Sequence, residues 1–102
     1  MENKYLNFYK DCIDVWGKDA QIKMCIEEMS ELTKEFCKNY REKFQDTPEQ
    51  IDHICEEIAD VQNMVDQMQY IFGIDKVNEY REKKVQRTKQ ILDDEKRRKN
   101  NG

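Results

Sequence analysis

Apolar residues recur along the chain every three or four positions, which is the spacing of one face of an α-helix. Two glycines and one polar stretch divide this pattern into four segments. Gly17 ends the first segment, residues 41–46 end the second, and Gly73 ends the third. The pattern therefore predicts an all-α fold, a four-helix bundle whose two long central segments form a hairpin.

Each segment carries an apolar stripe that we expect to face the core. The four stripes are, in order, Tyr5, Tyr9, Cys12, Ile13 and Trp16; Cys25, Met29, Leu32, Phe36 and Tyr40; Ile51, Ile54, Ile58, Val61, Val65, Met68 and Phe72; and Val77, Tyr80, Thr88, Ile91 and Leu92. Three further apolar residues, Met64, Tyr70 and Ile71, lie off the third stripe. We expect them to form part of a subunit interface.

The starts of the later segments also carry signals. Thr47-Pro48-Glu49-Gln50 places a capping residue before a first-turn proline and a glutamine three positions after the cap, which is a capping-box pattern. We expect the helix that follows to run for about 25 residues, or about 37 Å. Asp19 and Asp75 are the predicted caps of the second and fourth segments.

The length of 102 residues is that of one domain, which we place at residues 1–92, followed by a charged tail at 93–102 that we expect to fray. We expect no membrane-spanning helix and no secretory signal, and therefore a cytoplasmic protein. The four cysteines form no CxxC pair, so we expect reduced thiols in or near the core. Because so small a domain buries limited surface, we expect a homodimer or homotetramer to complete the core.

Charge is distributed unevenly along the chain. Residues 1–75 carry 8 basic and 17 acidic side chains, a net charge of −9, whereas residues 76–102 carry 10 and 5, a net charge of +5. An acidic body joined to a basic segment fits a cation-dependent phosphate site better than a general nucleic-acid surface. We therefore expect neither nucleic acid nor membrane as a partner.

Four acidic residues flank the stripes of the hairpin. Glu28 and Glu31 form an i,i+3 pair on the second segment, and Glu57 and Asp60 form one on the third. Both pairs lie to the same side of their stripe, so antiparallel packing would bring them toward one groove. Carboxylates gathered in this way repel one another, and a hard divalent cation such as Mg²⁺ would relieve the repulsion. A solvated acidic surface paired with Lys34 and Lys38 accounts for the pattern equally well.

The order Glu27-Glu28-x-x-Glu31 followed by Glu57-x-x-Asp60 resembles the EExxE…ExxD signature of the MazG-like all-α nucleotide pyrophosphohydrolases, a superfamily that also includes dimeric dUTPases. The resemblance extends from about Trp16 to Leu92. It implies Mg²⁺-dependent hydrolysis of a nucleoside triphosphate to a monophosphate and pyrophosphate, with Mn²⁺ as a substitute metal. It also implies that Glu28, Glu31, Glu57 and Asp60 are the catalytic metal ligands. Glu27 would then lie behind those ligands or bind an additional ion.

The basic fourth segment supplies candidates for substrate binding. Lys84 falls near the centre of that segment's apolar stripe, where a buried ammonium would need an anionic partner, and Arg81 and Arg87 flank it. The run Lys84-Val85-x-Arg87-Thr88 loosely matches the family's Asn-x-Lys-Phe-x-x-Arg pattern, with Glu82 in the position of the asparagine. These residues are our candidates for contact with the phosphates, and a structural ion pair is the alternative for Lys84.

Two residues near the first glycine are candidates for contact with the base. Trp16 could stack on a base or cover the core, and Gln21 could read a base edge or lie at the surface. For the whole chain, the alternative to an enzyme is a non-catalytic helical interaction module with an acidic face. A helix pair that binds nucleic acid through residues 76–99 fits less well, because acids alternate with its basic residues and no aromatic platform accompanies them.

Overall fold

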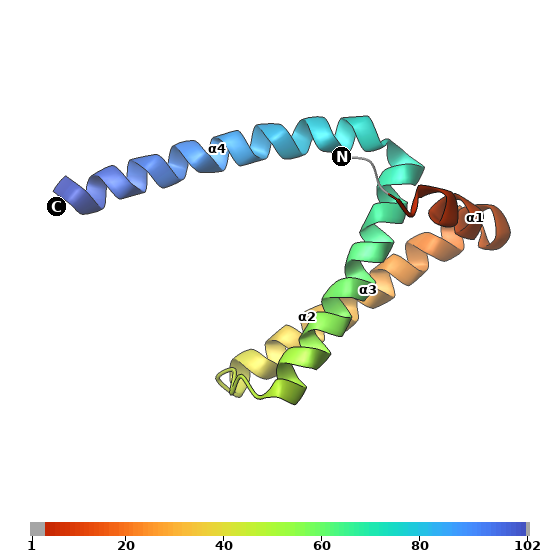
Figure 1. Cartoon of the computed structure of the whole chain (residues 1–102), viewed down its shortest axis with the longest axis horizontal. Coiled ribbons are helices and arrows are strands. Elements are labelled where there is room, and N and C mark those ends of the chain that lie inside the picture. Colours follow the sequence, from red (N-terminus) through yellow and green to blue (C-terminus); the bar gives the residue numbers. More distant parts are fainter. Residues whose placement is uncertain (1–3, 102) are drawn as a thin grey trace. The chain divides into compact units, whose positions relative to one another are not determined.

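The computed structural model describes residues 4–101 and contains four α-helices (Figure 1). They are α1 (Leu6–Trp16), α2 (Lys18–Arg41), α3 (Pro48–Phe72) and α4 (Ile74–Asn101). The described residues include no β-strand. The predicted all-α class, with four helices and a long central hairpin, is confirmed. The chain falls into two compact units, one ending at Phe72 and one beginning at Gly73, and each is described by itself.

Two glycines set the boundaries between consecutive helices. Gly17 has φ 90° and ψ 153°, a conformation open essentially to glycine alone, and α2 begins at the next residue. Gly73 has φ 134° and is followed directly by α4. Asp19 and Asp75 therefore lie inside the first turns of α2 and α4, and their prediction as capping residues was wrong. From those positions they still interact favourably with the helix dipole.

The predicted cap of α3 is confirmed. The backbone N–H of Gln50 donates a hydrogen bond to Thr47 Oγ1 at 3.2 Å. Gln50 returns a bond through its side chain, since its Oε1 accepts from the backbone N–H of Asp46 at 2.8 Å. Together they fix the point at which the loop after α2 turns into α3.

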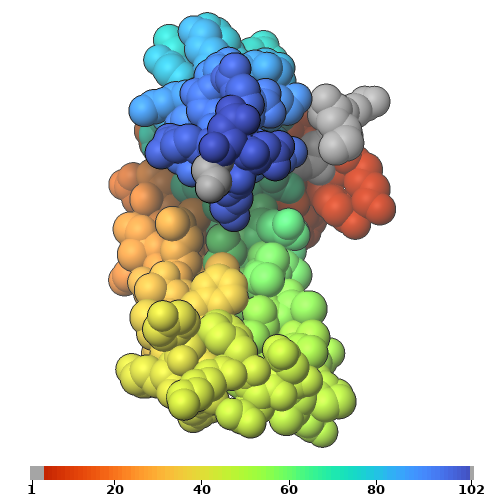
Figure 2. Space-filling model, turned by 90° about the vertical axis from the view of Figure 1, so that its left-hand side faces the viewer, coloured from red at the N-terminus to blue at the C-terminus, as the bar shows by residue number. Residues whose placement is uncertain are grey.

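In the first unit, α2 and α3 lie side by side and antiparallel, and α1 packs against both (Figure 1). Figure 2 shows the surfaces of α2, orange to yellow, and α3, green, adjoining at the loop end of the hairpin. The face of α2 with the least exposure has spacings of four and three residues. We call it the inner seam, and it consists of Gln21, Cys25, Glu28, Leu32, Glu35 and Asn39. The hairpin is thus joined by a seam that is largely polar.

The inner seam differs from the apolar stripe that the sequence predicts for α2. Met29, Phe36 and Tyr40 are exposed, because α3 packs on the face of α2 that lies one residue, about 100°, before them. Several other residues that we expected in the core are also exposed, namely Tyr5, Trp16, Ile51, Val65 and Phe72.

Met64 is buried, although we expected it to be exposed at a subunit interface. It is only 6% exposed and belongs to the core of the first unit, so its prediction as an interface residue was wrong. A helix packed between two others buries more than one stripe, and α3 contacts both α1 and α2. Tyr70 remains exposed and Ile71 is half-buried.

The cysteines divide into two pairs. Cys12 and Cys25 are buried, as expected for core thiols, whereas Cys37 and Cys55 are exposed. Burial raises the pKa of the Cys25 thiol, so this side chain stays protonated and behaves as a small apolar group.

The second unit is the single helix α4. It continues to Asn101, across the boundary at residue 92 beyond which we expected fraying. Ion pairs one turn apart, Arg97 with Asp94 and Arg98 with Glu95, support this charged end. None of its described residues is buried, and the stripe that we expected to face inward is about half-exposed at Ile91 and Leu92.

Across the described helices, none combines the length and the apolar character that crossing a membrane requires.

We predict that Gly17→Ala destabilises the fold by about 1–3 kcal/mol, because an alanine at this φ and ψ is strained. Apart from Gly17 itself and its neighbours along the chain, no atom of the described residues lies within 4 Å of the position that the new Cβ would take, so the cost comes from the backbone conformation. Urea unfolding followed by circular dichroism measures the loss. Lys23→Ala, at an exposed position of α2, is the control and should unfold like the unchanged protein. Equal stability of Gly17→Ala and the parent would contradict the prediction.

Candidate metal centre

Three carboxylates converge in the middle of the α2–α3 hairpin. Glu28 comes from α2, and Glu57 and Asp60 come from α3 at the i,i+3 spacing that places them on one helix face. One oxygen from each residue lies within 4.8 Å of those of the other two, and all three residues are half-buried. We call these residues the acid triad. Antiparallel packing therefore brings together three of the four predicted ligands.

Glu31, the fourth predicted ligand, is exposed and lies outside the acid triad, as does Glu27. The inner seam passes through Glu28 and Leu32, which leaves Glu31 on a different face of α2. Both outlying carboxylates still act on the triad through their charge, because each of them raises the pKa of Glu28.

Within the acid triad, the surroundings of Glu28 disfavour its ionised form. The pKa of Glu28 is raised first by burial and then by the negative charges of Asp60 and Glu57, with smaller contributions from Glu31 and Glu27. Glu57 adds a second cost, because its Oε2 is buried and has no hydrogen-bond partner among the described residues. A buried acceptor without a donor costs free energy that a bound cation would offset.

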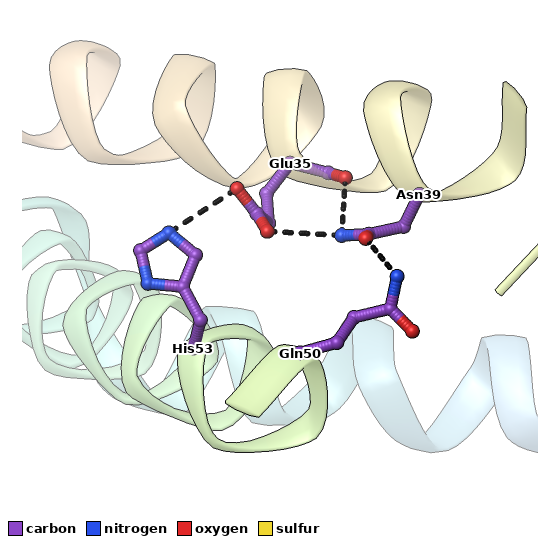
Figure 3. A network of polar contacts seen from close by, with 4 residues as sticks. All are labelled: Glu35, Asn39, Gln50 and His53. Carbon is purple, nitrogen blue, oxygen red and sulfur yellow. Dashed lines mark hydrogen bonds and ion pairs between the residues drawn. The ribbon is translucent and has the colours of Figure 1, made fainter. Parts of the chain in front are cut away.

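A neighbouring part of the inner seam contains an acid, Glu35, whose carboxylate has hydrogen-bond partners, unlike Glu57 Oε2 within the described residues. Glu35 lies two turns after Glu28 on α2 and faces His53 of α3, whose Nε2 is 3.2 Å from Glu35 Oε2 (Figure 3). Asn39 Nδ2 donates to the backbone oxygen and to Oε1 of Glu35 at 2.8 and 2.9 Å, and Gln50 Nε2 donates to Asn39 Oδ1. Glu35 therefore has hydrogen-bond donors, whereas Glu57 Oε2 has none within the part of the chain that the structure describes.

We did not anticipate the network of Glu35, Asn39, Gln50 and His53 from the sequence. The signal was present in the seven-residue spacing of Glu28 and Glu35, which places both on one face of a packed helix. The apolar pattern obscured it, since that pattern follows Met29, Phe36 and Tyr40 on the adjacent face.

Polar side chains are also buried toward the opposite end of the hairpin. The hydroxyl of Tyr9 donates toward Asn63 Oδ1 at 3.3 Å and Asp66 Oδ2 at 3.4 Å. Gln67, only 4% exposed, has a buried Oε1 that accepts no hydrogen bond from the described part of the chain. Gln67 was not among our candidates either.

The two candidates for base contact have contrasting environments. Trp16 is 63% exposed, so its ring is accessible for stacking and does not cover the core. Gln21 is 2% exposed, and its Nε2 lies 4.0 Å from Met24 Sδ. Gln21 therefore lies in the inner seam and not at the surface.

The basic candidates on α4 are exposed. Lys84, Arg81 and Arg87 all lie at the surface, and Lys84 lines a shallow, mainly apolar groove with Val85, Thr88, Lys89 and Leu92. We expected Lys84 on an inward face, and its exposure corrects that expectation. A single helix cannot cover its own apolar stripe, so a lysine on that stripe stays hydrated.

We predict that Glu28→Gln raises the midpoint of thermal unfolding by a few degrees at pH 7 in the presence of a chelator. Folding raises the pKa of the Glu28 carboxyl, so the folded state holds this proton more tightly than the unfolded state does. The stability that the bound proton contributes is therefore lost as the pH rises from the pKa of the unfolded state, about 4.3, through the pKa of the folded state. The gain from the substitution should therefore shrink toward pH 4. Thermal melts from pH 3 to 8 measure it, and Glu56→Gln, an exposed acid on α3, is the control. A variant that melts at or below the parent at pH 7 would contradict the prediction.

Comparisons with known protein families, curated proteins and solved structures found no match. The functional interpretation therefore depends on the residues themselves, above all on the acid triad and on the order of the two acidic motifs that supply it.

Proposed function

We propose that this protein is a Mg²⁺-dependent nucleoside triphosphate pyrophosphohydrolase that releases pyrophosphate and a nucleoside monophosphate. The observation that carries the proposal is the buried Oε2 of Glu57 inside the acid triad, which has no hydrogen-bond partner among residues 4–101. A carboxylate oxygen in this position lacks a positive partner, and a divalent cation is the partner that suits three converging carboxylates. The resemblance of the two acidic motifs to the MazG-like signature supplies the reaction.

In the proposed enzyme, Glu28, Glu57 and Asp60 hold the metal, and Glu31 and Glu27 add negative charge beside it. Carboxylate oxygens suit Mg²⁺, and Mn²⁺ can replace it with the same ligands. When bound, such a metal supplies a nucleophilic water at neutral pH and neutralises the phosphates. The carboxylates fix the position of the cation, and their exposed neighbours increase its attraction to the site.

The substrate contacts in this proposal come from the basic and aromatic candidates. Lys84, with Arg81 and Arg87, binds the phosphates, because an exposed ammonium or guanidinium is free to pair with an anion. The exposed ring of Trp16 stacks on the base, whereas Gln21 is buried in the inner seam and takes no part in this contact. We propose that the enzyme acts in the cytoplasm as a homo-oligomer.

We predict that Glu57→Gln abolishes pyrophosphate release from a panel of nucleoside and deoxynucleoside triphosphates at saturating Mg²⁺. The amide keeps the volume of the carboxyl group but removes the charge that attracts the metal. Glu56→Gln is the matched control, because it makes the same change at the adjacent, exposed acid, and it should retain turnover. Pyrophosphate release is measured directly, and thermal melts with Mg²⁺ and nucleotide report binding.

Two results would count against the enzyme. Near-normal turnover of Glu57→Gln would remove the acid triad from the reaction. The non-catalytic module with an acidic face would be favoured if the parent protein hydrolyses no member of the panel. The same holds if Mg²⁺ changes its melting temperature no more than another salt of equal ionic strength does.

We predict that Lys84→Met lowers kcat/KM by a factor of about 10²–10³, which is the usual effect of removing one group that stabilises a developing negative charge. Because Lys84 is exposed, its replacement should leave the melting temperature within about 2 °C of the parent value, as expected for a surface substitution. Lys83→Met is the control on the same helix, since the Lys83 ammonium is already paired with Glu79 at 3.2 Å. Equal turnover of the two variants would remove Lys84 from the proposed phosphate contacts.

A further inference from the structure

Two buried glutamines lie two helical turns beyond the acid triad, toward the end of the hairpin away from its loop. Gln21 of α2 precedes Glu28 by seven residues and is 2% exposed, and Gln67 of α3 follows Asp60 by seven residues and is 4% exposed. Seven residues of an α-helix span about 10 Å. Because α2 and α3 are antiparallel (Figure 1), equal steps in opposite directions along the two helices end at the same level. The two glutamines therefore lie level with each other, and we call them the amide layer.

The same step of seven residues separates the acid triad from the polar network on its loop side. His53 Nε2 of α3 lies 3.2 Å from Glu35 Oε2 of α2. Glu28 lies seven residues before Glu35, and Asp60 lies seven residues after His53, and these two carboxylates converge in the acid triad. The acid triad is therefore bracketed by two polar levels of the hairpin, the network on one side and the amide layer on the other.

The amide layer does not suit its surroundings as well as apolar residues would. Gln67 Oε1 is buried and accepts no hydrogen bond from the described residues, and Gln21 Nε2 lies 4.0 Å from Met24 Sδ, a long contact to a weak acceptor. A buried amide without good hydrogen bonds opposes folding. One turn away toward the acid triad lie Cys25 and Met64, which are apolar and buried. Leucine at both glutamine positions would therefore fit this part of the hairpin at lower free energy.

From this placement we infer that Gln21 and Gln67 are positioning residues for the acid triad. They hold α2 and α3 in the register that brings Glu28 beside Asp60, and they touch neither the cation nor the substrate. A polar residue buried between two packed helices selects one register in this way in coiled coils. The inference rests on the proposed function, because it concerns the carboxylates that would bind Mg²⁺.

The amide layer disfavours the neighbouring registers. A slip of the two helices by about one turn would set Gln21 level with Met64 in one direction, or Gln67 level with Cys25 in the other. Either slip would bury an amide against an apolar side chain, which costs free energy. Leucines would pack equally well at all of these levels, so the register that forms the acid triad would lose its advantage.

Gln21→Leu/Gln67→Leu should raise the Mg²⁺ dissociation constant by about 10-fold or more, the usual effect of removing residues that orient metal ligands. Its midpoint of thermal unfolding should equal or exceed that of the parent, because apolar side chains of similar volume replace incompletely bonded amides. Isothermal titration calorimetry of the full chain with Mg²⁺, and thermal melts without it, measure the two quantities. Gln62→Leu, at an exposed position of α3, is the control and should match the parent in both. An unchanged Mg²⁺ affinity, or a weaker affinity together with a lower melting midpoint, would overturn the inference.

A distance measurement reports the register without any metal. Spin labels are attached at Lys23→Cys and Gln62→Cys, two exposed positions on α2 and α3, and Cys37→Ser and Cys55→Ser remove the exposed native thiols. We expect one narrow distribution of label distances with the glutamines and a broader or shifted distribution with the leucines, and identical distributions would overturn the inference. If the parent binds no Mg²⁺, the proposed function fails, and the distance distributions alone decide whether the amide layer sets the register.

Discussion

The antiparallel register of α2 on α3 decides which side chains meet in the first unit. It places Asn39 against Gln50, Glu35 against His53, and Glu28 against Glu57 and Asp60. The register is set by the loop between Arg41 and Pro48, where Lys43, Phe44 and Asp46 all have positive φ and Thr47 caps the next helix. A loop one residue longer or shorter would rotate these partners away from one another, and the acid triad would not form.

The same seam holds two kinds of polar cluster that differ in their energetics. Around Glu35, donors from Asn39 and His53 satisfy the carboxylate, so this cluster specifies the register at little cost. In the acid triad, by contrast, three carboxylates face one another, and Glu57 Oε2 has no donor within the described chain. Like charges held together inside a packed seam oppose folding, and such local conflicts concentrate at functional sites.

The apolar core that opposes these costs is small. Among the described residues, only Tyr9, Cys12, Cys25 and Met64 are both apolar and buried. Many large apolar side chains remain at the surface of the isolated chain, including a whole face of α2. Hydrophobic burial scales with the area removed from water, so a hairpin with a polar inner seam gains little from that seam. Further apolar area is available on the exposed face of α2 that carries Ile26, Met29, Phe36 and Tyr40.

The sequence by itself determined the helical class, the number of helices and most of their ends, because periodicity, glycine and the Thr47 cap act over a few neighbouring residues. It also identified the acids that converge, since the i,i+3 spacing of Glu57 and Asp60 is local. Only the tertiary structure decided which face of each helix is covered. Both faces of α2 have heptad spacing, and the apolar pattern pointed to Met29, Phe36 and Tyr40, whereas α3 packs on the polar face beside them. That choice separates Glu28 from Glu31 and buries Gln21 and Met64, because burial depends on which helix packs where and not on the composition of any one helix.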